Sequence, residues 1–268
     1  KPSGAIDMTQ GKPINLMLRF ALPMMIGSIF QSLYSMVDSA VLGRFVGSHA
    51  LAAIGATTST TGLILLLATG VTSAISIVLS QYVGANDTDR VRKGIVASGW
   101  ITLLLGVVLG LISVFAARPL MQLLKTPEDV IDMSVLYIQI VCGCGIAQFA
   151  YNAAASILRA LGDSKTPLYF LILCSILNVI LDLISVIGLN MGVAGVAVAT
   201  VGSQAISAAI CILVMFRKYP DLMPKRHTLR LDMPVSLKIF GMGAQMALQS
   251  LFLSVGMMVI TRVINSYG

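Results

Sequence analysis

Long apolar segments recur along the whole of this 268-residue sequence, separated by short polar breaks. An α-helix of about 20 apolar residues crosses the ~30 Å hydrocarbon layer of a bilayer. Seven segments reach this length, namely 17–43, 57–80, 95–117, 131–157, 168–188, 193–216 and 236–264. Each is continuously apolar, whereas the strands of a membrane β-barrel alternate over about 10 residues. Since 57% of the residues are hydrophobic and only 11% are charged, composition agrees. The pattern predicts an all-α, polytopic membrane protein.

The net charge of +7 does not indicate a nucleic-acid partner, because the Lys and Arg residues are scattered through the breaks without a basic helix. Their distribution instead indicates topology. With the N-terminus in the cytoplasm, 14 basic residues fall inside, while only Arg44, Arg118, Lys125 and Arg262 fall outside. Basic residues accumulate on the cytoplasmic side of membrane proteins. We therefore expect a multi-pass protein of the inner (plasma) membrane with a cytoplasmic N-terminus.

Polar side chains lie on one face of several segments when they are placed at 100° per residue. In the first segment this face holds Gln31, Ser35 and Asp38. The second, fifth and sixth segments have similar stripes, and the fourth has a shorter one of Gln148, Tyr151, Asn152 and Ser156. The third is nearly apolar and is expected to face lipid. For the Ser and Thr positions alone, close helix packing explains a stripe equally well.

Asp38 and Asp182 are the only acidic residues well inside any segment, since Asp132 is the second residue of the fourth and the others lie in the breaks or near the N-terminus. An aspartate within a membrane helix costs about 2.5–3.5 kcal/mol on insertion scales and usually faces a bundle interior or a water-filled cavity. In the predicted topology both lie roughly 8–9 Å below the outer end of their segments, at 1.5 Å per residue. Asn178 lies one turn from Asp182 on the same face. We interpret the pair as an ion relay; the alternative is two separate structural hydrogen bonds.

No motif indicates an enzyme or a bound cofactor. The sequence contains no Walker-type phosphate loop and no nucleophile and base pair at a plausible depth. Cys142 and Cys144 form a C-x-C pair, but helical spacing points them apart and no other ligand is close in sequence. No metal site is therefore predicted.

A weak internal repeat appears when the sequence is shifted by 218 residues. Gln249 then falls on Gln31 and Arg262 on Arg44, while Gly256 takes the place of Asp38. The repeat predicts a six-helix transmembrane lobe at 1–216, a cytoplasmic linker at 217–235 and, at 236–268, the first helix of a second lobe. The rest of that second lobe is expected to be missing from this chain.

Four stretches in order resemble multidrug and toxic compound extrusion (MATE) transporters: VDSAVLGRFVGSHALAAIG (37–55), RALGDSKTP (159–167), NVILDLI (178–184) and GVAGVAVAT (192–200). The resemblance covers the N-terminal lobe and the seventh helix of that family. In its branch that is considered proton-coupled, the matching ion-coupling positions are Asp38, Asn178, Asp182, Asn152 and Thr200. Pro23 would bend the first helix on protonation or form a static kink.

The resemblance implies a secondary active exporter that exchanges H⁺ or Na⁺ for bulky, often cationic organic compounds by alternating access. We assign the substrate cavity to Gln31, Tyr34, Ser35, Tyr151 and Gln204. The expected partners are drug-like small molecules, membrane lipid and the second lobe. The alternative is a lipid-linked oligosaccharide flippase of the same superfamily. Such a protein needs basic residues inside the cavity to hold a pyrophosphate, and the segments contain none at that depth.

Overall fold

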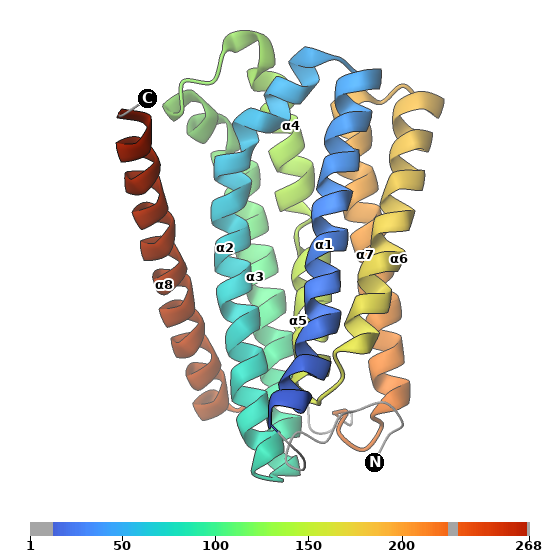
Figure 1. The fold of residues 1–268 in the computed structure, drawn as a ribbon, viewed down its shortest axis with the longest axis vertical. Coiled ribbons are helices and arrows are strands. Elements are labelled where there is room, and N and C mark those ends of the chain that lie inside the picture. Colours follow the sequence, from blue (N-terminus) through green and yellow to red (C-terminus); the bar gives the residue numbers. More distant parts are fainter. Residues whose placement is uncertain (1–12, 225–229, 267–268) are drawn as a thin grey trace.

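The computed structural model describes residues 13–224 and 230–266 and is helical nearly throughout, with no strand among those residues. The helices run along the long axis of the molecule (Figure 1). They are α1 (Pro13–Phe45), α2 (Ser48–Gly84), α3 (Thr88–Leu123), α4 (Glu128–Gly143), α5 (Ile146–Ala160), α6 (Lys165–Leu183), the π-helix η1 (Ile184–Gly188), α7 (Gly192–Lys218) and α8 (Met233–Ser266). We call the end where α1 begins, α2 ends and α8 begins the lower end, as drawn in Figure 1.

Five stretches of the described chain are each long and apolar enough to cross a membrane. They are Ile14–Phe45, Thr60–Gly84, Thr88–Leu123, Lys165–Gly188 and Gly192–Lys218, and α4 and α5 qualify together as a bent pair. These spans match the first six predicted segments, and α8 covers the seventh as a helix. The predicted all-α, polytopic membrane fold is confirmed.

The fourth segment is not the single helix expected over 131–157. It is broken between α4 and α5, which meet at an angle of 43°. Glycines flank the break at Gly143 and Gly145, and glycine weakens a helix by about 1 kcal/mol relative to alanine. The break lies directly against α3, because a Cβ added at Gly110 would stand 2.9 Å from the carbonyl oxygen of Gly143. Close approach of the two backbones thus accompanies the bend.

The main apolar core fills the lower half of the bundle between α2, α3, α5, α7 and α8. Its fully buried side chains include Ile75, Leu79, Leu158 and Ile239. Helix α8 joins this core through a close contact with α2: a Cβ added at Gly70 would lie 2.9 Å from the backbone nitrogen of Ala247 and 3.0 Å from the carbonyl oxygen of Gly243. From this contact α8 leans away from α2 towards the upper end (Figure 1).

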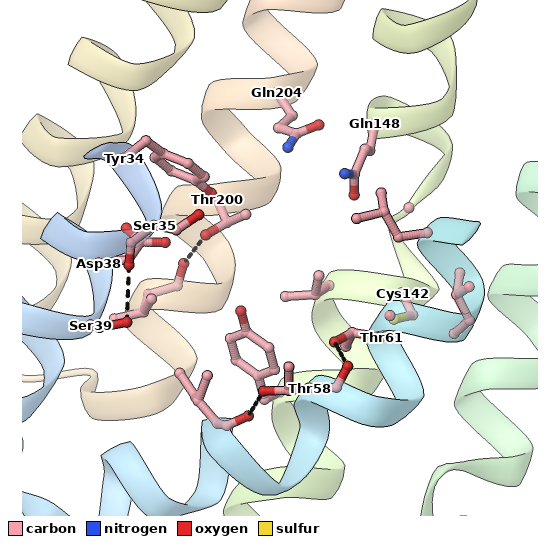
Figure 2. Close-up of a pocket in the computed structure, with 18 of the residues that line it drawn as sticks. Tyr34, Ser35, Asp38, Ser39, Thr58, Thr61, Cys142, Gln148, Thr200 and Gln204 are labelled. Atoms are coloured by element: carbon pink, nitrogen blue, oxygen red, sulfur yellow. Dashed lines mark hydrogen bonds between the residues drawn. The ribbon is translucent and has the colours of Figure 1, made fainter. Parts of the chain in front are cut away.

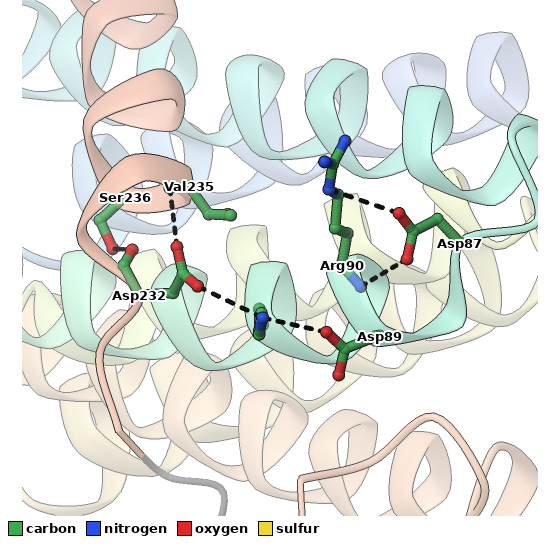
Figure 3. Close-up of polar contacts among 7 residues, drawn as sticks. Asp87, Asp89, Arg90, Asp232, Val235 and Ser236 are labelled. Atoms are coloured by element: carbon green, nitrogen blue, oxygen red, sulfur yellow. Dashed lines mark hydrogen bonds and ion pairs between the residues drawn. The ribbon is translucent and has the colours of Figure 1, made fainter.

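Ionic contacts fix the start of α8 to the first turns of α3 (Figure 3). Lys93 Nζ lies 3.0 Å from Asp89 and 3.6 Å from Asp232. Asp232 in turn caps α8, since its carboxylate accepts a hydrogen bond from the backbone nitrogen of Val235 at 3.2 Å. Arg92 donates two hydrogen bonds, of 2.9 and 2.7 Å, to the carbonyl oxygen of Asp221. The described parts of the linker are therefore held against α3 at both ends.

A buried carboxylate joins the α5–α6 turn to the end of α7. Asp163 is 1% exposed and accepts hydrogen bonds from the backbone nitrogen of Thr166 at 3.1 Å, from its hydroxyl at 2.6 Å and from Lys218 Nζ at 2.6 Å. Burial alone would raise the pKa of Asp163, but the hydrogen bonds from Lys218 and Thr166 hold it below its ordinary value. Asp163 is therefore a charged anchor for the first turn of α6.

Candidate ion-coupling and substrate site

A cavity of about 350 Å³ lies in the upper half of the bundle, between α1, α2, α4, α5 and α7. Figure 2 shows side chains of these helices around it. On α1 the lining residues recur at helical spacing: Gln31, Tyr34, Ser35, Asp38, Ser39 and Leu42. Helix α7 contributes Val196, Thr200 and Gln204, which are four residues apart. The structure thus places Gln31, Tyr34, Ser35 and Gln204 in one cavity, together with Asp38 and Thr200.

Asp38 and Asp182 come together, but only Asp38 lines the cavity. Asp182 is 0% exposed and lies behind the wall. Asn178, also fully buried, stands between them on the same helix as Asp182. With its amide oriented to satisfy its neighbours, the Asn178 nitrogen donates to Asp38 Oδ1 at 2.8 Å and to Asp182 Oδ2 at 3.3 Å. The other orientation donates only to Thr200 Oγ1, at 3.5 Å.

The site is short of hydrogen-bond donors. Among the described residues, Asp182 Oδ1 has no hydrogen-bond partner, although it is buried. The two carboxyl groups approach the same donor, since the Asn178 nitrogen lies 2.8 Å from Asp38 Oδ1 and 3.3 Å from Asp182 Oδ2. Desolvation disfavours the charged form of a carboxyl, and two adjacent negative charges disfavour it further.

Tyr34 and Thr200 complete the polar wall beside Asp38 (Figure 2). Tyr34, Asp38 and Thr200 all line the cavity. Thr200 Oγ1 donates to the carbonyl oxygen of Val196 at 2.9 Å, so its orientation is fixed by its own helix. Asp38 thus sits between the cavity and a small buried network.

A π-helix begins two residues after Asp182. The five residues of η1, Ile184–Gly188, form one wide turn in which the backbone nitrogen of Leu189 donates to the carbonyl oxygen of Ile184 at 3.0 Å. Single π-helical turns are rare and occur frequently at functional sites. Helix α7 approaches closely here, since a Cβ added at Gly195 would lie 3.0 Å from the Cβ of Ser185. No feature of the sequence analysis predicted this turn.

Two predicted site residues lie outside the cavity lining. Tyr151, expected in the substrate cavity, is buried, and its hydroxyl donates to the carbonyl oxygen of Pro167 at 3.0 Å. Asn152, expected beside the carboxylates, is half-buried on α5 and is not among the lining residues. The reason is depth, because below Gln148 the next turns of α5 pack into the lower core through Ala153, Ala154 and Ile157. Pro23 lies within α1, which continues through it without a break.

The cavity also contains residues that the sequence analysis did not single out. Among them are Thr58 and Thr61 of α2 and Tyr137 of α4, while Cys142, considered above only as a metal ligand, also lines the cavity. Their signal in the sequence is weak, because Thr58 and Thr61 precede the more polar stripe of α2 and Tyr137 lies on the far side of the bend. None of the lining residues is basic. Across the described residues no three His, Cys, Asp or Glu side chains converge as a metal site would require.

Sequence comparisons identify the family. Residues 23–184 match the family model described as MatE. A relative from Bacillus subtilis (strain 168), described as "Probable multidrug resistance protein YpnP", is 32% identical over 268 residues, which is 98% of this chain and 59% of the relative. "Probable multidrug resistance protein YoeA" of the same strain is 29% identical over 93% of this chain and 55% of its own length. The chain thus spans less than two thirds of these relatives.

Solved structures agree with the sequence comparisons. A structure described as the outward-facing conformation of a multidrug resistance MATE family transporter of the MOP superfamily has a TM-score of 0.88 and 25% identity, over 96% of this chain and 57% of that one. A structure of MATE in the bent conformation has a TM-score of 0.86 and 25% identity. The match covers 100% of this chain and 60% of that chain. The family model covers more than half of this chain, and the YpnP relative aligns with nearly all of it. The chain belongs to the MatE family.

Proposed function

We propose that this chain supplies one lobe of a proton-coupled exporter of bulky organic cations. The observation that carries the proposal is the pair of carboxyl groups joined through Asn178, in which Asp182 is buried and the half-buried Asp38 lines the cavity. Relatives are named multidrug resistance proteins, which supports export of drug-like compounds. Members of a transporter family need no catalytic nucleophile, so the proposal includes no enzymatic step.

In the proposed cycle a proton enters through the cavity and is taken up by Asp38. From there it is shared with Asp182 through the network around Asn178. Without the proton, Asp38 places a negative charge on the cavity wall and attracts a cationic compound. With it, that attraction is removed and the compound is released. Because binding effects are reciprocal, a proton that weakens cation binding must itself be bound more weakly when the cation is present.

The lining supports a cationic or neutral substrate. Amide and hydroxyl groups of Gln31, Ser35 and Gln204 offer hydrogen bonds, and among the lining residues that the structure describes Asp38 alone is charged. A flippase for lipid-linked oligosaccharides would need cations for a pyrophosphate, and the lining holds no Lys or Arg. We therefore favour export of organic cations. Na⁺ as the coupling ion is the second candidate, because a cation could replace the proton between two carboxylates.

We propose that the lower end faces the cytoplasm, because basic residues concentrate there. We also propose that transport requires a second lobe that rocks against this one. Two observations support a second lobe. The first is the sequence repeat at a shift of 218 residues. The second is that α8 starts at Met233, within two residues of the position that the start of α1 takes after the same shift. Alternating access in such transporters is largely rigid-body movement of one repeat against the other.

The test uses liposomes that contain the complete transporter, this lobe together with its second lobe. Efflux of a fluorescent organic cation is followed with a proton gradient alone, with a sodium gradient alone, and with neither. The proposal predicts efflux with the proton gradient alone. Efflux driven only by the sodium gradient would identify Na⁺, and not H⁺, as the coupling ion. No efflux of the cation under either gradient, in vesicles whose protein is shown to be folded, would contradict the proposed export.

A further inference from the structure

The hydroxyl groups that line the cavity around Asp38 already use their hydrogen atoms. Each aliphatic hydroxyl that the structure places in the lining donates to the carbonyl oxygen four residues earlier on its own helix, at 2.9–3.3 Å (Figure 2). These are the hydroxyls of Ser35, Ser39, Thr58, Thr61 and Thr200. A hydroxyl has one hydrogen atom and two acceptor lone pairs. Towards the cavity these groups therefore offer acceptor atoms without breaking an existing bond.

The other polar groups of the lining do not reverse this balance. A glutamine amide has as many acceptor lone pairs as N–H donors, and a tyrosine hydroxyl both donates and accepts. The lining holds Gln31, Gln148, Gln204, Tyr34 and Tyr137. Asp38 adds a carboxylate, which only accepts when it carries no proton. Among the lining residues that the structure describes there is no Lys or Arg to supply donors in return. The cavity thus presents an excess of acceptors to a ligand.

The acceptors come from more than one wall of the cavity. Asp38 and Ser35 are three residues apart on α1, whereas Thr58 and Thr61 are three residues apart on α2. Figure 2 shows the two threonines on a different helix from Asp38, around the same space. An ion pair with Asp38 alone would leave the α2 acceptors without a donor. A cation with several N–H groups can satisfy acceptors on both walls.

Apolar side chains and the volume limit the shape of the ligand. The lining includes Leu51, Ile54, Leu65 and Phe149. Its volume of about 350 Å³ is near the lower end of the ~300–1,000 Å³ that small-molecule sites enclose. The cavity therefore suits a compact ring system with a small charged head.

We infer that the cavity selects cations whose charge is carried by N–H groups, such as aryl amidinium or guanidinium ions, over fully N-alkylated cations. The N–H groups donate to Asp38 and to the hydroxyl oxygens of Thr58 and Thr61. A fully alkylated cation has no donor, so it displaces water from these acceptors and leaves them unpaired. This inference rests on the proposed function, because it names the class of cation that the same cavity would export.

The test measures binding, separately from transport. The complete transporter, this lobe together with its second lobe, is purified, and radiolabelled 2-naphthamidinium is compared with its N,N,N′,N′-tetramethyl analogue by equilibrium dialysis. Both ions are charged, but only the first has N–H donors. Specific binding is the part that excess unlabelled cation displaces. We expect 2-naphthamidinium to bind about tenfold more tightly, as for the loss of hydrogen bonds to a charged donor. Equal affinity of the parent transporter for the two ions would overturn the inference.

A paired substitution separates hydrogen bonding from size, because the methylated ion is also larger. Thr58→Val combined with Thr61→Val removes both α2 acceptors while keeping the branched shape of the side chains. The preference should fall to about threefold or less, through weaker binding of 2-naphthamidinium alone. Unchanged binding of the tetramethyl ion shows that the variant is folded. Thr57→Val is the matched control: Thr57 is buried outside the lining, and its hydroxyl also donates to its own helix, to the carbonyl oxygen of Ile54 at 2.7 Å.

The remaining outcomes are distinct. If size alone excludes the methylated ion, the preference in the paired variant will equal that of the parent, and the inference fails. If neither ion binds to a transporter that exports the fluorescent cation, the inference also fails while the proposed function stands. If 2-naphthamidinium is preferred and the paired variant loses that preference, yet no gradient drives efflux, the inference holds and the proposed coupling fails.

Discussion

The carboxyl groups of Asp38 and Asp182 come from different helices and meet at one atom, the amide nitrogen of Asn178, which lies 2.8 Å from the first and 3.3 Å from the second. Their exposures differ: Asp38 lines the cavity, whereas Asp182 is completely buried. In the proposed cycle this asymmetry gives the pair a direction: Asp38 exchanges the proton with the cavity, and Asp182 acts through Asp38.

Removal of the bridge should uncouple the two acids. Asn178→Ala leaves Asp182 without its amide donor in a buried site, so we expect a loss of about 1–3 kcal/mol in stability and a loss of proton-driven export. Asn152→Ala is the control, because Asn152 is half-buried outside the cavity lining. Thermal melting and liposome efflux measure both effects. If Asn152→Ala impairs coupling as strongly as Asn178→Ala, the site must extend beyond the cavity wall.

The contact between α2 and α8 should not tolerate even one added methyl group. Gly70→Ala would bring a Cβ within 2.9 Å of the α8 backbone, so we expect about 1–3 kcal/mol of destabilisation and weaker docking of α8. Gly241→Ala, on α8 but with open space around it, should be neutral or slightly stabilising. Melting temperature and cross-linking between the two helices test this. Equal stability of the two variants would show that the contact yields easily.

Acid should weaken the anchor at Asp163. Its pKa is below the ordinary value in the folded chain, so its stabilising contribution is fully present above about pH 4 and is lost as the pH falls through the folded pKa. Asp163→Asn breaks a buried pair with Lys218 and should cost about 3–5 kcal/mol at neutral pH. In melting curves from pH 7 to pH 3, the difference between parent and variant should shrink below pH 4. A difference that stays constant over this range would exclude the charge as the source.

The proposed orientation can be read from cysteine labelling. Single cysteines placed at Asn86 in the α2–α3 turn and at Lys125 in the α3–α4 turn, in a background that lacks the four native cysteines, lie at opposite ends of α3. A reagent that does not cross membranes should label the Lys125→Cys variant in intact cells and the Asn86→Cys variant only after permeabilisation. The reverse pattern would invert the lobe and place the lower end outside.

Much of this architecture follows from helical spacing and residue counts. The apolar segments predicted the spans, and the equal depth of Asp38 and Asp182 follows from counting residues to the end of each helix. The spacing could not show that Asp182 lies behind Asp38, because a helical wheel gives the direction of a side chain and not its neighbour. It also could not place Tyr151, since the lower limit of the cavity depends on how α5 packs between α2 and α7. The break after Gly143 and the π-helix after Leu183 lie where two helix backbones approach closely. The only sign of such an approach in the sequence is a glycine, and a glycine alone does not predict a break or a π-helix.

The most direct test of the central claim is proton-driven efflux from complete transporters that carry Asp38→Asn or Asp182→Asn. Asparagine keeps the size and much of the hydrogen bonding of the carboxyl group but cannot carry the exchanged proton. We predict that both variants are folded and inserted yet no longer couple export to a pH gradient. Ser39→Ala, which removes a cavity hydroxyl that only bonds the carbonyl oxygen of Ser35 at 2.9 Å, should keep near-normal rates. Efflux at the parental rate from both Asn variants would contradict the account, because the carboxyl groups would then be purely structural.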